Sequence, residues 1–249
     1  MSIEKIPGIH NYCDRWCERC SFGSRCAIYE SESDLSPEEN DMESRAFWDR
    51  LAVNFSKAQQ MLEQAARERG IDLQSITSEM TDYAEKEKRK TEENRSHPLS
   101  KLSLEYSGLA MKWVDSQPGM EDKLKAIQQQ LDLNPESFKE MKATTETIQD
   151  CLAVIQWYET FIHVKFMRAL MGKSMNVYED EDQRDCDGSA KIALIAIERS
   201  MQAWIKLFEL LPDQEDEFLK ILAVLEKLKT LAIEEFPNAM AFKRPGFDD

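Results

Sequence analysis

Four cysteines near the N-terminus are the residues whose types and spacing best suit a chemical role. Thiolates bind Zn²⁺ and iron–sulfur clusters tightly, and short turns between cysteines let successive sulfurs point at one centre. In a reducing cytoplasm such a group predicts metal ligands rather than disulfides. The spacing is C-x3-C-x2-C-x5-C, and the four residues are Cys13, Cys17, Cys20 and Cys26.

The compact spacing favours an iron–sulfur cluster over zinc. Zinc sites usually join two separated pairs of ligands, whereas [4Fe-4S] clusters often draw theirs from one tight run. We therefore expect a [4Fe-4S] cluster as cofactor, with structural zinc as the alternative and copper, a redox dithiol or no metal as further alternatives. Nearby arginines would offset thiolate charge and aromatic rings would exclude water. These residues are Arg15, Arg19 and Arg25, and Tyr12, Trp16 and Phe22.

Two other interpretations of the cluster are weaker. The C-x3-C-x2-C spacing is also that of radical S-adenosylmethionine enzymes, but the chain has no alternating strand pattern and no glycine-rich cofactor motif, and Cys26 is available as a fourth ligand. His10 lies three residues before Cys13 and could replace one cysteine. We favour a histidine that packs or forms hydrogen bonds beside the site.

A second group of polar residues lies in the predicted helical body. Glu159 and His163 are four residues apart and share a helix face, and Lys191 and Arg199 lie on a strongly apolar helix. Together they could form a pocket for acid–base chemistry or for an anionic ligand. The favoured interpretation is a buried Glu159 paired with His163 or with a basic residue of another helix. A ferritin-like dimetal site is not supported, because no Glu-x-x-His motif is present.

Three other residues have simple expected roles. Cys151 beside Leu152 is expected to be a small buried hydrophobic residue. Cys186 is expected in an acidic loop, where neighbouring carboxylates make it a poor nucleophile. Asp187 is expected to cap the helix that follows Gly188.

The composition indicates that helices position these residues. Only eight glycines and eight prolines occur in 249 residues, while good helix formers are abundant. Periodicity and capping signals predict an all-α bundle of about six to seven helices. The expected helices cover residues 36–70, 73–95, about 102–115, a short stretch around 124–131, about 135–171, about 190–211 and about 218–232.

Two apolar rows mark the predicted centre of the bundle. The first is interrupted only at Glu159, and the second continues on a helix that is apolar nearly all round. The rows are Ile148, Leu152, Ile155, Ile162, Phe166 and Ala169, and Ala190, Leu194, Ile197, Met201, Trp204, Phe208 and Leu211. We expect a cysteine-rich metal-binding segment at 1–35, a helical bundle at 36–249, and a C-terminal end that packs back through Phe242 and Phe247.

Charge and hydropathy restrict the partners. With 47 acidic and 32 basic residues the net charge is -15, which opposes nucleic-acid binding. No signal-peptide region and no run of about 18 apolar residues is present, so we expect a cytoplasmic protein that does not enter the membrane. A protein partner remains possible.

Three phrases of the sequence resemble a family of uncharacterised bacterial proteins. They are Ile9 to Cys20 (IHNYCDRWCERC), Asp187 to Lys191 (DGSAK) with Arg199-Ser200, and Phe236-Pro237 with Arg244 to Phe247 (RPGF). The resemblance extends over the whole chain and implies a bacterial, cytoplasmic protein. It implies no activity and no site residues.

The sequence thus supports three functional hypotheses. The first is an iron–sulfur protein for redox sensing or electron transfer. The second is an interaction module in which zinc staples a segment too small to build its own core. The third is an enzyme with a polar pocket in the bundle.

Overall fold

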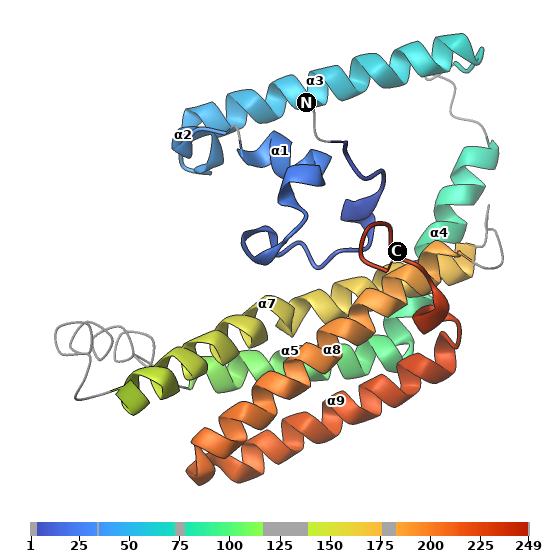
Figure 1. The fold of residues 1–249 in the computed structure, drawn as a ribbon. Helices are drawn as coiled ribbons and strands as arrows, with labels where there is room; N and C mark the ends of the chain where they lie inside the picture. Colours follow the sequence, from blue (N-terminus) through green and yellow to red (C-terminus); the bar gives the residue numbers. More distant parts are fainter. Residues whose placement is uncertain (1–3, 34, 73–77, 117–138, 176–182, 249) are drawn as a thin grey trace. The chain divides into compact units, whose positions relative to one another are not determined.

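The computed structural model describes residues 4–33, 35–72, 78–116, 139–175 and 183–248. These residues form eight α-helices and several short 3-10 helices, without a strand (Figure 1). The all-α prediction is confirmed. The helix number exceeds the predicted six to seven. Residues 27–33, expected in the cysteine-rich segment, form a helix, and residues 37–40 form a helix separate from the rest of the one predicted from residue 36. The predicted helix around 124–131 lies outside the described residues.

The chain divides into two compact units. We call Met1–His10 with Cys17–Arg89 the N-terminal unit, and Asn11–Trp16 with Lys90–Asp249 the bundle unit. These boundaries differ from the expected segments 1–35 and 36–249. The short stretch Asn11–Trp16 groups with the bundle, whereas more than fifty residues beyond position 35 group with the cysteine-rich segment.

The N-terminal unit begins with short turns, continues into a long helix and, up to Arg89, includes the first part of helix α4 (Ser78–Ser96). Its elements are η1 (Ile9–Asn11, whose last residue groups with the bundle unit), η2 (Cys17–Arg19), η3 (Gly23–Arg25), α1 (Ala27–Ser33), α2 (Pro37–Asn40) and α3 (Arg45–Glu68). The predicted capping box opens α2, because the Ser36 hydroxyl accepts from the Glu39 amide and the Glu39 carboxylate accepts from the Ser36 amide.

The continuous helix predicted from residue 36 to Gly70 is interrupted after α2. The Asp41 carboxylate accepts the Glu43 amide, and the Ser44 hydroxyl accepts the Ala46 amide and caps α3. Short polar side chains that bond nearby amides compete with the helix, which explains the break. The predicted stop is confirmed, since Gly70 follows α3 with a φ of 66°.

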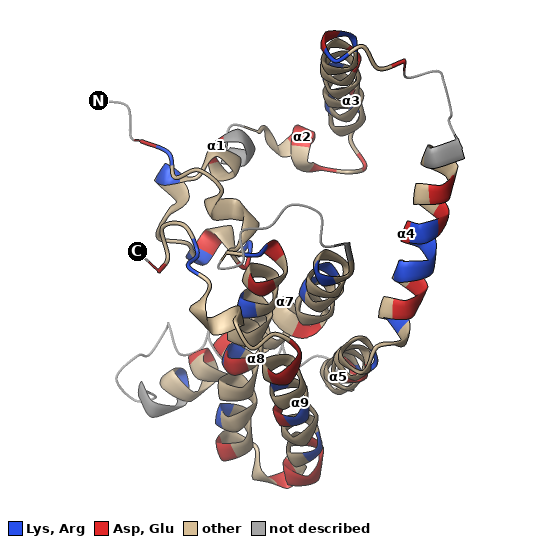
Figure 2. Cartoon of the chain, turned by 90° about the vertical axis from the view of Figure 1, so that its right-hand side faces the viewer, with Lys and Arg blue, Asp and Glu red and all other residues tan. Residues whose placement is uncertain are grey.

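Helix α4 (Ser78–Ser96) is strongly charged and mostly exposed. Figure 2 shows basic and acidic turns alternating along it. This confirms the expectation of a solvated helix in that region; residues 73–77, which the prediction included, lie outside the described residues.

Four long helices form the body of the bundle unit. Helix α7 packs along α8, α8 against α9, α9 against α5, and α5 against α7, which closes a four-helix ring. The helices are α5 (Pro98–Asp115), α7 (Lys139–Met175), α8 (Asp185–Leu210) and α9 (Glu215–Glu235), with the short helices η5 (Pro212–Gln214) and η6 (Ala239–Ala241) after α8 and α9.

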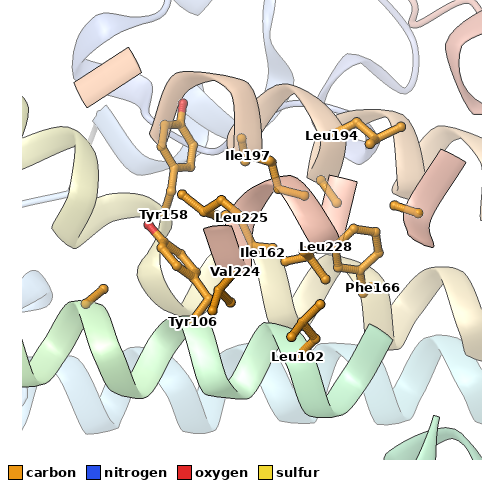
Figure 3. Packing of buried hydrophobic residues seen from close by; sticks show 14 of the residues in the cluster. Leu102, Tyr106, Tyr158, Ile162, Phe166, Leu194, Ile197, Val224, Leu225 and Leu228 are labelled. Carbon is orange, nitrogen blue, oxygen red and sulfur yellow. The ribbon is translucent and has the colours of Figure 1, made fainter. Parts of the chain in front are cut away.

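Both predicted apolar rows line the core of this ring. Figure 3 shows Ile162 and Phe166 of α7 close to Ile197 of α8 and Leu228 of α9. Burial of each such side chain contributes roughly 2 kcal/mol. Helix α8 is the most buried of the four, as its nearly continuous hydrophobicity predicts.

The C-terminal segment packs back onto α8, as expected. Phe242 is buried, and the Lys191 ammonium donates to its carbonyl oxygen at 2.6 Å. The same ammonium pairs with the Asp248 carboxylate, which Arg244 also holds. Among the described helices, none has both the length and the apolar character needed to cross a bilayer.

Candidate metal-ligand cysteines

None of the four cysteines of the N-terminal cluster forms a disulfide, and each has intermediate exposure. Cys17 and Cys20 flank one 3-10 turn, in which the Cys20 amide donates to the Cys17 carbonyl at 3.2 Å. Cys26 closes the next turn by donating its amide to the Gly23 carbonyl. Local backbone turns therefore hold these three cysteines of the N-terminal unit.

Two of the sulfurs accept backbone hydrogen bonds from the residue two positions later. The Phe22 amide donates to the Cys20 sulfur at 3.4 Å, and the Arg15 backbone amide donates to the Cys13 sulfur. Arg15 adopts a left-handed conformation with a φ of 60°, which is unusual for a residue other than glycine. Amide donors aimed at sulfur stabilise the thiolate form that binds metals.

A short loop holds Cys13 on the bundle unit. We call Asn11–Trp16 the docked loop. The Asp14 carboxylate accepts the Tyr158 hydroxyl at 2.7 Å and the Arg199 guanidinium, and the Asp14 carbonyl accepts the Trp157 indole N–H at 2.9 Å. The residue after Cys13 is thus bonded to both α7 and α8.

Aromatic side chains add to this docking. Trp16 stacks on Trp157 with 5.0 Å between the ring centroids. The Tyr12 hydroxyl donates to Asp185 at 2.9 Å, and its ring lies 4.6 Å from that of Phe242. Both rings cover Gly188, where a Cβ would lie 2.5 Å from Tyr12. Glycine is therefore required at this position.

The surroundings of Cys13 combine burial with positive charge. Burial raises the pKa of the Cys13 thiol, while the Arg15 amide and the charges of Arg15 and Lys165 act in the opposite direction. Lys165 of α7 is 8% exposed, and burial lowers its pKa. Sequence reasoning named Arg15 as a source of compensating charge but missed Lys165, because its helix lies about 150 positions away in the chain.

The four residues of the predicted pocket have separate partners. The Lys191 ammonium binds the C-terminal segment at Asp248, and Arg199 binds Asp14 of the docked loop. The expected ion pair of either residue with Glu159 is replaced by these contacts. Burial, and secondarily the charge of Asp115, raise the pKa of the Glu159 carboxyl.

His163 faces α5 instead of Glu159. Its Nδ1 lies 2.9 Å from the Ser103 hydroxyl. Burial lowers the pKa of His163, against a smaller raising effect of a hydrogen bond with the Ser100 backbone. Among the described residues, the hydrogen bonds and ion pairs of the four predicted pocket residues go to other partners and join no two of the four.

Three expectations about single residues have definite outcomes. Cys151 is buried in the core, as predicted. Cys186 is also buried, at 1% exposure, because α8 begins at Asp185 and the expected loop position is wrong. Arg184 occupies the N-cap position predicted for Asp187, and the buried Asp187 carboxylate pairs with Arg184 at 2.8 Å.

Several contacts of the docked loop were not predicted from sequence. Asp14 lies between two candidate ligands, so a polar contact was plausible, but nothing in the sequence identified Tyr158, Trp157 and Arg199 as its partners. His10, the alternative ligand, lies in η1 at intermediate exposure.

Within the described ranges, no group of three or more His, Cys, Asp or Glu side chains is arranged to hold a metal ion. Comparisons with protein-family models, curated proteins and solved structures find no match. The resemblance to a bacterial family therefore stays a prediction.

Proposed function

We propose that Cys13, Cys17, Cys20 and Cys26 bind an iron–sulfur cluster, which the protein uses for redox sensing or electron transfer. The observation that carries the proposal is the presence of four partly exposed cysteines, none of them in a disulfide, within fourteen residues of sequence. Thiolates at this spacing suit a thiophilic metal, and in a reducing compartment they would not pair as disulfides.

The hydrogen bonds at sulfur support this choice. Amide donors at Cys13 and Cys20 lower the free energy of the thiolate and are among the features that set the potential of a cluster. The positive charges of Arg15 and Lys165 act in the same direction on Cys13. At Cys151, burial and then the charge of Asp150 raise the pKa of the thiol against a smaller opposing effect of Lys206, so this thiol is expected to stay inert.

The proposal requires the thiols to converge when the metal binds. Metal binding and folding are commonly coupled in sites of this size, since ligand thiolates are brought together by the ion itself. The docked loop would present Cys13 in advance, because Asp14 and Trp16 already hold its neighbours on the bundle.

Anaerobic purification followed by elemental analysis and visible spectroscopy tests the proposal. The expected result is about four irons per chain and a broad visible absorption that bleaches with dithionite. Cys17→Ala should lose both, and Cys151→Ala, which removes a thiol outside the cluster, should keep both.

Two results would contradict the iron–sulfur assignment. One zinc per chain in colourless protein would instead support the zinc-stapled interaction module. The second result is a protein that is purified without metal and that binds neither zinc nor ferrous iron supplied together with sulfide. It would contradict metal binding altogether.

A further inference from the structure

Helix α3 exposes a row of large apolar side chains. Trp48 is 57% exposed, Phe55 68% and Leu62 59%. Large apolar groups that line up on one helix are unusual on a protein surface and mark an interaction site. This surface is on a helix that contains none of the four cysteines, so its role does not depend on the proposed metal centre.

The spacing of the row is that of a coiled-coil seam. Its members alternate between steps of three and four residues, which is a strict heptad pattern over most of a helix of 24 residues. A seam of this kind fits another helix, and at 1.5 Å per residue the two could pair over about 30 Å. The seam, as we call it, consists of Trp48, Leu51, Phe55, Ala58, Leu62 and Ala65.

The edges of the seam carry little charge. In coiled coils, charged residues beside the seam select the partner and oppose unsuitable ones. In α3 only Arg45 and Glu68 are charged at these positions, one at each end and of opposite sign. The remaining edge positions are uncharged, so two copies of α3 meet no like-charge repulsion. They are Phe47, Ala52, Asn54, Gln59, Met61 and Ala66.

Side-chain sizes favour an antiparallel pair. If Phe55 of one chain faces Ala58 of the other, Trp48 then faces Ala65, so a large side chain meets a small one at both layers. Close packing requires such alternation. The remaining layer pairs Leu51 with Leu62.

A parallel pair would be poorly matched. It would place two Trp48 rings in one layer and two Ala58 methyl groups in another. It would also bring the two Arg69 side chains, at the next seam position, to the same level. The antiparallel arrangement instead brings Arg45 of one chain to the end that holds Glu68 of the other.

We propose that α3 pairs antiparallel with α3 of a second copy of this chain, which makes the protein a homodimer. Sedimentation equilibrium of the full chain over a range of concentrations tests this. Phe55→Gln and Leu62→Gln, both at exposed positions, should each raise the dimer dissociation constant at least about tenfold.

Val53→Gln is the matched control. Val53 is 51% exposed but lies on the opposite side of α3 from the seam, so the dimer should persist. Unchanged helical circular dichroism in all three variants shows that folding is retained. A wild-type chain that stays monomeric throughout, or equal weakening by Val53→Gln and Phe55→Gln, would overturn the proposal.

Cross-linking separates the two orientations. Oxidation of a mixture of L51C and L62C chains should join the two introduced thiols of different chains, as mapped by mass spectrometry. Self-linking of L62C alone, without the mixed product, would indicate a parallel pair and overturn the antiparallel assignment.

Discussion

The docked loop Asn11–Trp16 and the following segment Cys17–Cys26 are adjacent in sequence but are held in different ways. The docked loop makes side-chain bonds to α7 and α8 through Asp14, Tyr12 and Trp16. The second segment is held by backbone turns and by the half-buried Lys5, whose ammonium donates to the Ser24 carbonyl and pairs with Glu30.

This difference bears on how a metal would be bound. A ligand on a loop fixed by buried partners keeps its position before the metal arrives, whereas ligands on simple turns can adjust to the ion. One firmly placed cysteine followed by three adjustable ones would make metal affinity sensitive to contacts of the docked loop far from the sulfurs. Four substitutions, from the largest expected effect to the smallest, test this comparison.

Gly188→Ala should weaken the docked loop most. The new Cβ would lie 2.5 Å from the Tyr12 ring and 2.7 Å from Phe242, so both rings must move. We expect the free energy of unfolding to fall by about 3 kcal/mol, as overpacked cores show. Urea unfolding followed by circular dichroism measures the loss.

Gly108→Ala serves as the control for this substitution. Gly108 lies inside α5, and a Cβ there has no atom within 4 Å. Alanine should therefore stabilise the helix by about 0.5–1 kcal/mol. If Gly188→Ala raises the unfolding midpoint as Gly108→Ala does, Tyr12 does not pack closely on Gly188.

Asp14→Ala should lower the free energy of unfolding by about 2 kcal/mol, because it leaves the buried Tyr158 hydroxyl without its acceptor. Metal affinity should fall as well, since Cys13 loses its adjacent anchor. Asp14→Asn keeps an acceptor and should lose less in both measurements. Equal behaviour of the two variants and the wild type would show that the docked loop is not held by this carboxylate.

Asp248→Asn tests the C-terminal segment that packs beside Tyr12. The hydrogen bonds from Arg244, chiefly, and from Lys191 hold the pKa of Asp248 well below its usual range. The carboxylate therefore stabilises the fold above the unfolded-state pKa of about 4, and this contribution is lost as the pH falls further toward the folded-state pKa.

We expect Asp248→Asn to be about 1 kcal/mol less stable than wild type at neutral pH, with the difference shrinking below about pH 4. Urea unfolding at several pH values measures it. A difference that stays constant down to the lowest pH would mean that the ion pairs with Arg244 and Lys191 do not form.

Lys5→Ala should have the smallest effect. Its partner Glu30 has a side chain 62% exposed, and exposed ion pairs contribute little, so we expect a loss of about 0.5 kcal/mol that decreases with added salt. Melting curves at low and high salt measure it. A loss as large as that of Asp14→Ala would show that the segment Cys17–Cys26 is held as firmly as the docked loop.

Local signals in the sequence predicted most helix ends. The capping box at Ser36, the stop at Gly70 and the end of α8 before Pro212 are confirmed, because each depends on neighbouring residues only. The start of α8 was misplaced by a few residues. Its N-cap Arg184 makes no side-chain cap bond, so no sequence signal marked it.

The sequence by itself determined the all-α class, the two core-facing rows and the group of four thiols, since hydrophobic period and cysteine spacing are local properties of the chain. Tertiary structure alone decided which side chains meet. It joined Asp14 to Tyr158 and Arg199, and Lys191 to Asp248, instead of forming one polar pocket. Pairing of charges across long separations depends on how helices pack, and that packing is not encoded in any one segment.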